Sequence, residues 1–240
     1  MTTPRVVAHR GSSALHPGNS WAAFEAAVAE GADTIECDVQ RTRDGVLIIR
    51  HDLGLGDRLV AECAAAEIAA MEPGLVRLAD LLAWAPRANI GLLVELKDPD
   101  VAVPVAAMVA ASRWCERIVL GSFHGPALAA AKTRAPAAIR TSLMIGSVVS
   151  TEDLVRLAAA YRADGVHPCW EHRSPHPHRL LDQAAIARLR EAGLAITLWH
   201  EERESELRAL IDLQPDAICT NTPALLRQLI EESIAAPVAQ

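Results

Sequence analysis

The sequence predicts a closed (β/α)8 barrel with a short insertion after the second strand. Apolar runs rich in β-branched residues alternate about eight times with Ala- and Leu-rich segments of helical spacing. The composition does not change abruptly along the 240 residues, a length that one such barrel commonly has. Hydrophobic residues make up 51% of the chain and aromatic residues only 3%, which suits a core of Val, Leu, Ile and Ala. We therefore expect one domain of the TIM-barrel class over residues 1–240; an open, doubly wound sheet is the alternative fold.

The strands are expected where β-branched runs are short, and the helices where apolar residues recur every three or four positions. Ser20 and Thr151 are expected helix N-caps, and Gly31 and Gly193 expected helix stops. The predicted strands are Arg5–His9, Asp33–Asp38, Ile90–Glu95, Arg117–Gly121, Ile139–Leu143, Asp164–His167, Ala195–Trp199 and Asp216–Thr220. The predicted helices are Trp21–Glu30, Leu78–Trp84, Val101–Ser112, Ala127–Arg134, Leu154–Ala160, Asp182–Ala192, Glu204–Asp212 and Ala224–Glu232.

The alternation is interrupted once, between the second strand and the following barrel helix. Arg43-Asp44-Gly45 is typical of a tight turn, so Val46–Arg50 is expected to pair as a hairpin strand beside strand two. Ala61–Met71 has the composition of a short extra helix. We interpret residues 53–76 as a small insertion on the catalytic side of the barrel.

Charge and cysteine content exclude some classes of protein. A net charge of −7 and a pI near 5.7 argue against broad nucleic-acid binding. The five cysteines are odd in number and form no CxxC pair, as expected for reduced thiols. The amino terminus resembles no secretory signal, and no apolar run could span a bilayer. We expect a cytoplasmic protein without stable membrane association; the sequence indicates no particular oligomeric state.

Carboxylates gather where the first predicted strands end, the side of a barrel that carries the active site. Glu36 and Asp38 are two residues apart, so their side chains share one face of strand two, and Glu95 ends strand three. Adjacent carboxylates repel one another unless a cation lies between them. Three acidic oxygen ligands suit a hard divalent cation, Mg²⁺ or Ca²⁺. An ion-paired rim, with Glu95 bonded to Arg10 or Lys97, is the alternative.

Histidines and cations flank these carboxylates. His9 ends strand one and His51 follows the hairpin, and we interpret them as an acid–base pair, because imidazole titrates near neutral pH. Arg10 and Lys97 would supply the positive charge that a phosphoryl group needs, and both could also neutralise the carboxylates.

Two aromatic residues are candidate pocket walls. Trp199 either contacts the carbon face of a small alcohol or packs in the core or at the rim, and Phe123 is a weaker candidate of the same kind. The long loop Pro168–His178 could cover the site. Its histidines lack a regular metal-ligand spacing, which favours a solvated loop.

The ordered set of motifs resembles the glycerophosphodiester phosphodiesterase family. The resemblance covers almost the whole chain, and it includes Ser122-Phe123 after strand four and Trp199 after strand seven. Its motifs are His9-Arg10-Gly11, Glu36-x-Asp38, His51-Asp52, Glu95-Leu96-Lys97 and the closing Asp216-Ala217-Ile218-Cys219-Thr220-Asn221-Thr222-Pro223.

The resemblance implies a barrel enzyme that cleaves a small-molecule glycerophosphodiester to glycerol 3-phosphate and an alcohol such as choline or ethanolamine. It implies one divalent cation, Mg²⁺ or Ca²⁺, held by Glu36, Asp38 and Glu95. His9 and His51 would be the general acid–base pair. Arg10 and Lys97 would contact the phosphate, with either water or the substrate's neighbouring hydroxyl as the nucleophile.

The chain departs from the family's pattern in ways that bear on the substrate rather than on the chemistry. Pro17-Gly18-Asn19-Ser20 stands where Pro-Glu-Asn-Thr is usual, and Leu53–Arg58 stands in place of a common Arg-Thr-Thr. The insertion is short. His200 replaces a common Thr, and Asn221 a common Asp.

Three other functions fit parts of the pattern. A lysophospholipase D-like enzyme would need an apolar groove or a membrane-binding helix at the barrel mouth. A metal-dependent enolising enzyme would use Lys97 as its base. A non-catalytic phosphodiester-binding barrel would not need His9 and His51, and both are present.

Overall fold

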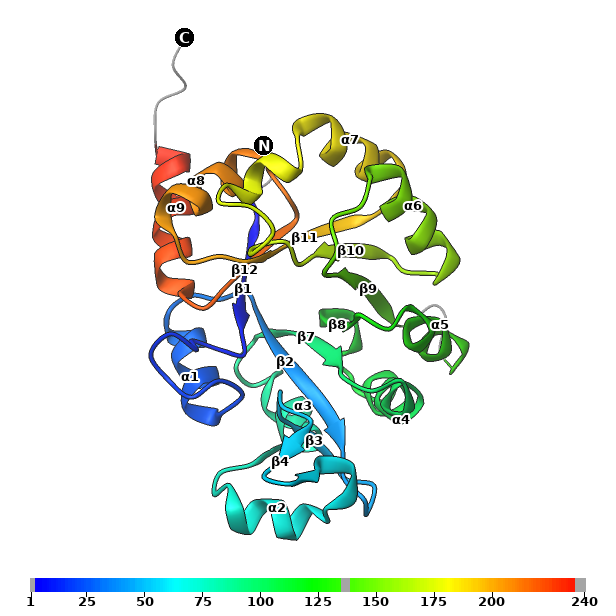
Figure 1. The fold of residues 1–240 in the computed structure, drawn as a ribbon. Coiled ribbons are helices and arrows are strands. Elements are labelled where there is room, and N and C mark those ends of the chain that lie inside the picture. Colours follow the sequence, from blue (N-terminus) through cyan, green and yellow to red (C-terminus); the bar gives the residue numbers. More distant parts are fainter. Residues whose placement is uncertain (1–2, 135–138, 236–240) are drawn as a thin grey trace.

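The computed structural model describes residues 3–134 and 139–235, and it has a closed barrel of eight parallel strands at its centre (Figure 1). The strands follow the order β1-β12-β11-β10-β9-β8-β7-β2, and β1 pairs with β2 to close the sheet. Closure confirms the barrel and excludes the open sheet. The strands are β1 (Arg5–His9), β2 (Thr34–Arg41), β7 (Gly91–Leu96), β8 (Ile118–Ser122), β9 (Arg140–Ile145), β10 (Gly165–Pro168), β11 (Ala195–His200) and β12 (Ala217–Thr220).

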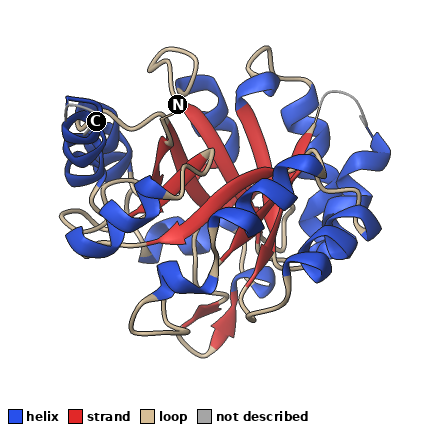
Figure 2. Ribbon diagram, turned by 90° about the horizontal axis from the view of Figure 1, so that it is seen from above, coloured by secondary structure: helices blue, strands red, loops and turns tan. Residues whose placement is uncertain are grey.

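Helices follow the strands along the chain and surround the barrel, as Figures 1 and 2 show. They are α1 (Trp21–Ala29), α3 (Leu78–Trp84), α4 (Ala102–Ala110), α5 (Gly125–Arg134), α6 (Thr151–Ala160), α7 (Gln183–Glu191), α8 (Glu204–Asp212) and α9 (Pro223–Ala235). Short 3-10 turns at Pro99–Val101, Cys115–Arg117 and Pro177–Leu180 complete the connections.

The main hydrophobic core lies between the strands and the helices. On α4 the buried residues are Ala102, Val105, Ala106 and Val109, the three- and four-residue spacing of one helix face. Each fully buried Val contributes about 1.5–3 kcal/mol to folding. Small Ala side chains let the helices approach the sheet closely, which explains why few aromatic residues are needed.

The predicted helix ends are largely confirmed, with one correction. Ser20 caps α1 by accepting a hydrogen bond from the Ala23 amide. The predicted cap at Thr151 is wrong, because Ser150 accepts from the Asp153 amide and Thr151 is already helical. Two adjacent hydroxyl residues offer the same signal, and the extended backbone of Ser150 selects it.

Residues 42–77 form the excursion beside β2. The hairpin is confirmed: β3 (Leu47–Ile49) pairs antiparallel with β2 after a turn at Gly45, and β6 (Val76–Arg77) adds to β3. The strands β4 (Gly54–Leu55) and β5 (Arg58–Leu59) form a separate two-stranded ribbon. The predicted helix Ala61–Met71 is shorter than expected. Only α2 (Ala65–Met71) is α-helical, preceded by a 3-10 turn at Val60–Glu62.

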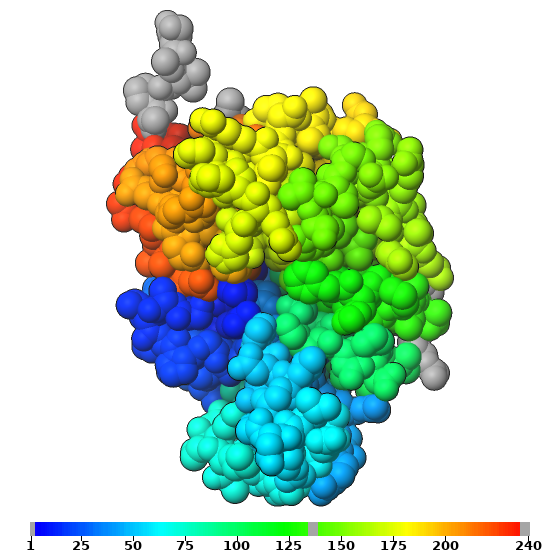
Figure 3. All heavy atoms as spheres, in the orientation of Figure 1, coloured from blue at the N-terminus to red at the C-terminus, as the bar shows by residue number. Residues whose placement is uncertain are grey.

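The face of the molecule in Figure 3 is the one at which the barrel strands end. The segment after β1 (blue), the excursion (cyan) and the loop after β10 (yellow-green to yellow) surround its centre. These connections carry the polar residues described next.

Candidate active site

Three carboxylates meet where β2 and β7 approach the barrel mouth. Glu36 and Asp38 lie on the same face of β2, and Asp38 is the strand partner of Glu95 on β7. Their exposed fractions are 1%, 0% and 7%, and one oxygen of each lies within 4.8 Å of the others. The atoms Glu36 Oε1 and Asp38 Oδ1 are buried and accept no hydrogen bond among the described residues, although Asp38 Oδ1 forms an ion pair with Lys97. Buried oxygens without hydrogen bonds in a carboxylate cluster fit a cation site.

The carboxylates perturb one another's titration. Burial and then the negative charge of Asp38 raise the pKa of Glu36, and the same two causes raise the pKa of Glu95 to about 7. Burial alone would also raise the pKa of Asp38, yet Lys97 and Arg10 together lower it. The cluster therefore retains a proton near neutral pH unless a cation replaces it.

Lys97 and Arg10 border the carboxylates from two sides. The ammonium Nζ of Lys97 lies 2.9 Å from Glu95 Oε1 and 3.4 Å from Asp38 Oδ1. The guanidinium Nε of Arg10 lies 3.3 Å from Asp38 Oδ2, and the Arg10 amide donates to Glu36 Oε2 at 3.0 Å. Both cations thus neutralise carboxylates in this structure, one of the two roles expected from the sequence.

The chain turns sharply after β1 to place Arg10. Its φ of 57° lies in the left-handed region, which is uncommon for a residue with a side chain and recurs at functional sites. Gly11 follows with φ 83°, and a Cβ there would lie 2.6 Å from the carbonyl carbon of Ala23 in α1. The His-Arg-Gly order therefore has a structural reason: only Gly allows this turn to pack against the helix.

His9 projects from the end of β1 beside the carboxylates. Its Nδ1 lies 2.7 Å from Asn221 Oδ1, and its Nε2 lies 3.9 Å from Glu36 Oε2. The amide oxygen can only accept, so Nδ1 carries the proton and Nε2 of the neutral ring has a free lone pair. Burial, then the neighbouring His200 and Arg10, lower the pKa of His9 to about 3.

His51 approaches the same cavity from the loop after β3. Its Nδ1 lies 2.7 Å from Asp52 Oδ1, and its side chain is about two-fifths exposed. The hydrogen bond from His51 lowers the pKa of Asp52.

A cavity of about 160 Å³ lies between the two histidines and contains most of the predicted site. Phe123 forms part of its wall, as expected, although its side chain is largely exposed. The lining residues are His9, Arg10, Glu36, His51, Glu95, Lys97, Phe123, Met144, His167, Cys169, Glu171, His200 and Cys219.

Trp199 does not line this cavity. It is fully buried in the core around β11, where its ring lies 6.3 Å from that of Trp170. The pairing of β11 with β12 shifts between Leu198 and His200, so the regular alternation of side chains is broken there. His200 faces the cavity instead, and of the two possibilities open for Trp199 the structure shows core packing.

Sequence reasoning assigned no role to Asn19. Its amide nitrogen donates to Asp38 Oδ2 at 2.7 Å, and its Oδ1 accepts from the Asp38 amide. Asn19 thereby holds a carboxylate of the cluster. Its left-handed φ of 60° and its place just before the N-cap Ser20 are the signals that could have revealed it.

The loop after β10 is anchored rather than freely solvated. His176 and His178 approach the buried carboxylate of Glu206 on α8, with Nδ1–oxygen distances of 3.2 and 2.7 Å. Arg173 donates to the Gly146 carbonyl at 2.7 Å. Two side-chain groups involving this loop have ligand atoms close enough to hold a metal ion: His176, His178 and Glu206, and Glu171, His172 and His200.

The comparisons with known proteins agree with this geometry. The model of the glycerophosphoryl diester phosphodiesterase family matches residues 9–225, which include the described carboxylates, histidines and cations. The chain belongs to this family. The resemblance inferred from the motifs is therefore confirmed.

Several members of the glycerophosphoryl diester phosphodiesterase family match this chain over almost their whole length. The chain is 25% identical to a glycerophosphodiester phosphodiesterase of Caldanaerobacter subterraneus subsp. tengcongensis, over 95% of this chain and 98% of that protein. The crystal structure of an Agrobacterium tumefaciens glycerophosphodiester phosphodiesterase is 26% identical, with a TM-score of 0.77 over 94% of this chain and 99% of that one. An Oleispira antarctica phosphodiesterase, solved with the product sn-glycerol-3-phosphate, shares the fold at 22% identity, with a TM-score of 0.79 over 95% and 97% of the two chains.

The helices of the described part of this family member are all too short or too polar to cross a membrane.

Proposed function

We propose that this protein hydrolyses glycerophosphodiesters to glycerol 3-phosphate and an alcohol with the help of one divalent cation. The observation that carries the proposal is the cluster of three buried carboxylates, two of whose oxygens accept no hydrogen bond, beside two histidines and two cations that line the same cavity. The names of the relatives and the product bound in the Oleispira antarctica enzyme support it.

Glu36, Asp38 and Glu95 would hold the cation. Their oxygen ligands fit Mg²⁺ or Ca²⁺ better than a softer metal. When bound, such a cation polarises phosphoryl oxygens and lowers the pKa of a coordinated hydroxyl or water. Asn19 positions one of these ligands through its hydrogen bond to Asp38.

The histidines would transfer the protons. The free lone pair on His9 Nε2 suits a base that accepts the proton of the attacking hydroxyl group. This hydroxyl belongs either to water or to the neighbouring carbon of the substrate. His51, beside Asp52, would donate a proton to the departing alcohol oxygen. A new bond from oxygen to phosphorus forms as the bond to the alcohol oxygen breaks, so one proton enters at His9 and one leaves from His51.

Arg10 and Lys97 would bind the phosphate. Both border the cavity and carry positive charge in an otherwise acidic protein. Burial alone would lower the pKa of Lys97, yet Glu95 and Asp38 raise it. A lysine whose ammonium is ion-paired with two carboxylates is poorly suited to abstract a proton, which argues against the enolising function that the sequence left open.

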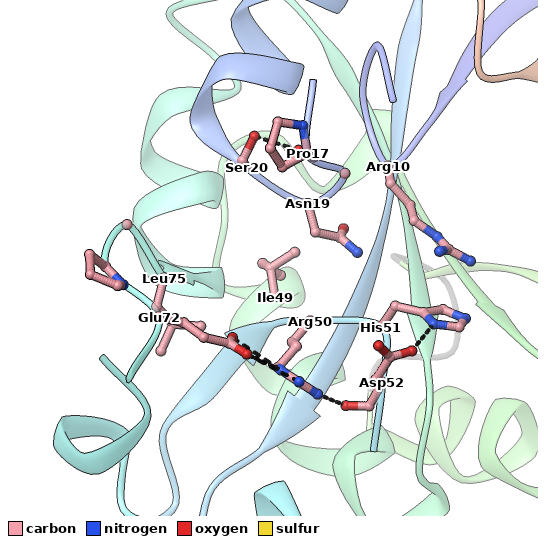
Figure 4. Close-up of a pocket in the computed structure, with 13 residues that line it drawn as sticks. Arg10, Pro17, Asn19, Ser20, Ile49, Arg50, His51, Asp52, Glu72 and Leu75 are labelled. Atoms are coloured by element: carbon pink, nitrogen blue, oxygen red, sulfur yellow. Dashed lines mark hydrogen bonds and ion pairs between the residues drawn. The ribbon is translucent and has the colours of Figure 1, made fainter. Parts of the chain in front are cut away.

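The residues that line a neighbouring cavity also argue against a single-chain lipid substrate. A second cavity of about 390 Å³ adjoins the first at Arg10 and His51 and extends toward Glu72 and Leu75. Figure 4 shows that ion pairs and polar side chains cross it, among them Arg50 with Glu72. We expect a small polar alcohol there. A cytoplasmic location remains our expectation, supported by five free cysteines.

The proposal is tested by treating the protein with a chelator and measuring release of glycerol 3-phosphate from glycerophosphocholine, with Mg²⁺, Ca²⁺ or Mn²⁺ added back. Glycerophosphoethanolamine and glycerophosphoglycerol serve as further substrates. We expect no turnover without metal and restored turnover with at least one ion. Undiminished activity of metal-free protein would refute the cation requirement. The absence of turnover with every metal and every diester would refute the function.

A further inference from the structure

Polar atoms that form no hydrogen bond belong to three residues that line the 160 Å³ cavity and are outside the carboxylate cluster. Glu171 Oε2, His167 Nδ1 and His200 Nδ1 are each buried and form no hydrogen bond within the described part of the chain, although His200 Nδ1 lies within ion-pair distance of Glu202. His167 is only 2% exposed. Burial of a polar atom without a hydrogen-bond partner is unfavourable, so a ligand that supplies the missing partners would be bound favourably here. The proposed acid–base chemistry uses none of them.

The fold brings these residues together from two neighbouring strands. His167 belongs to β10, and Glu171 follows three residues after the strand ends. The irregularity in β11 turns His200 into the cavity, where its ring stacks on that of His9 with centroids 4.5 Å apart. The pair of Glu171 and His200 therefore lies directly beside the proposed base.

Glu171 and His200 face one another without forming a good hydrogen bond. The distance from Glu171 Oε1 to His200 Nε2 is 3.4 Å, and His200 Nδ1 lies 3.4 Å from Glu202 Oε1. A carboxylate that can only accept and an imidazole that can donate suit a ligand that both donates and accepts, as neighbouring hydroxyl groups do. A phosphoryl group would be repelled by Glu171, whereas Arg10 and Lys97 in the lining of the same cavity would attract it.

The positions of the two cavities indicate how the bound substrate would be oriented. The smaller cavity contains these unpaired groups, whereas the larger one extends from Arg10 and His51 along the excursion (Figure 4). The two share Arg10 and His51, so a phosphate held there would have one ester group in each cavity.

We infer that Glu171 and His200 bind the glycerol hydroxyls of the diester, with His167 as a further partner, and that the departing alcohol occupies the larger cavity. This inference rests on the proposed function, and it makes Glu171 and His200 determinants of specificity for the glycerol group. His200 stands where the family commonly has Thr, so this recognition belongs to a feature particular to the chain.

The experiment compares glycerophosphocholine with the analogue in which the glycerol hydroxyl farthest from the phosphate is replaced by hydrogen. The analogue keeps the hydroxyl next to the phosphate ester, so both routes of attack stay open. For the wild type we expect kcat/KM to favour the glycerol diester by about 10- to 100-fold, because the analogue leaves a buried acceptor unpaired. Glu171→Gln and His200→Thr should each reduce this preference to within a few-fold of unity.

Glu204→Gln is the matched control, because Glu204 is exposed on α8 and paired with Arg208. It should leave both the preference and the activity unchanged. Thermal unfolding establishes that each variant folds, and the two variants test the pair independently.

The possible outcomes distinguish a failure of the inference from a failure of the proposed function. If the wild type cleaves neither diester, the proposed function fails. If the wild type cleaves both diesters, the function stands. If, in addition, Glu171→Gln and His200→Thr both retain the wild-type preference, the inference is wrong. The cluster of Glu171, His172 and His200 also has metal-ligand spacing, so bound metal is counted in each protein. A second ion that is lost in Glu171→Gln would likewise overturn the inference.

Discussion

At the scale of single residues, Asn221 determines which nitrogen of His9 faces the carboxylates. Its Oδ1 lies 2.7 Å from His9 Nδ1, so the lone pair of the neutral ring is on Nε2. An Asp at this position, common in the family, would favour the charged imidazolium. The neutral amide fixes the ring without adding charge to a site that already contains three carboxylates.

His9→Ala should abolish most turnover, because it removes the proposed base while leaving the cation ligands in place. Proton transfer by a positioned side chain typically contributes about 10²–10⁴-fold. The measurement is kcat for glycerol 3-phosphate release, together with metal affinity by titration. His124→Ala, an exposed histidine after β8, is the control. Wild-type turnover in the His9 variant would refute its role.

Removing a cation ligand should act on metal binding first. Glu36→Gln keeps the shape of a buried side chain while removing its charge, so we expect metal affinity to fall by at least about 10-fold. Titration of chelator-treated protein with Ca²⁺ or Mg²⁺ measures this. Unchanged affinity would exclude Glu36 as a ligand.

The raised pKa values predict how metal binding depends on pH. The pKa of Glu95 rises from its ordinary value of 4.5 to about 7 in the metal-free protein. Between these values the native state binds more protons than the unfolded chain, so this group lowers the free energy of unfolding as pH increases. A cation that replaces the proton should therefore stabilise the protein more at pH 8 than at pH 5.5.

The shift in the thermal midpoint on adding Ca²⁺ or Mg²⁺ measures this effect. An equal shift at the two pH values would contradict the assignment of the raised pKa to the cation site.

At the scale of elements, the turn after β1 places the site residues through a backbone conformation that requires glycine. Gly11 and Gly45 both have a φ of 83°, but a Cβ at Gly11 would meet Ala23 at 2.6 Å, whereas nothing lies within 4 Å of one at Gly45. Gly45→Ala should cost about 1 kcal/mol through its backbone conformation alone. Gly11→Ala should cost about 1–3 kcal/mol more, because the clash is with the α1 backbone.

Urea unfolding of the two glycine variants measures both costs. Equal losses of stability would show that the close packing of the turn against α1 is unimportant.

The cap of α6 offers a second test at this scale. Ser150→Ala should lower the free energy of unfolding by about 1 kcal/mol, because the Asp153 amide loses its acceptor. Thr151→Ala should have a smaller effect, since Thr151 lies inside the helix. The reverse order in urea unfolding would support the cap that the sequence analysis expected.

At the scale of the whole molecule, alternation of strand and helix was enough to predict the barrel. All eight barrel strands lie within a few residues of their predicted positions, because each is a short apolar run between helices of clear periodicity. The carboxylates and both histidines could be placed for the same reason: strand ends of a closed barrel meet at one mouth.

The rest of the site depends on local irregularities that a periodic pattern does not reveal. The register shift in β11 exchanges Trp199 for His200 at the cavity. Asn19 reaches Asp38 only because the chain turns back after Arg10. Glu171 lies in a loop whose path depends on contacts with distant elements, such as those of His176 and His178 with α8.

We propose above that the carboxylate cluster, with its cation, and the two histidines break the bond between phosphorus and the alcohol oxygen. The most direct measurement is ³¹P NMR of glycerophosphocholine hydrolysis in ¹⁸O-labelled water, with and without added Mg²⁺ or Ca²⁺. We expect metal-dependent formation of glycerol 3-phosphate with one ¹⁸O on phosphorus and unlabelled choline. Label in the choline, or an unchanged diester with metal present, would contradict it.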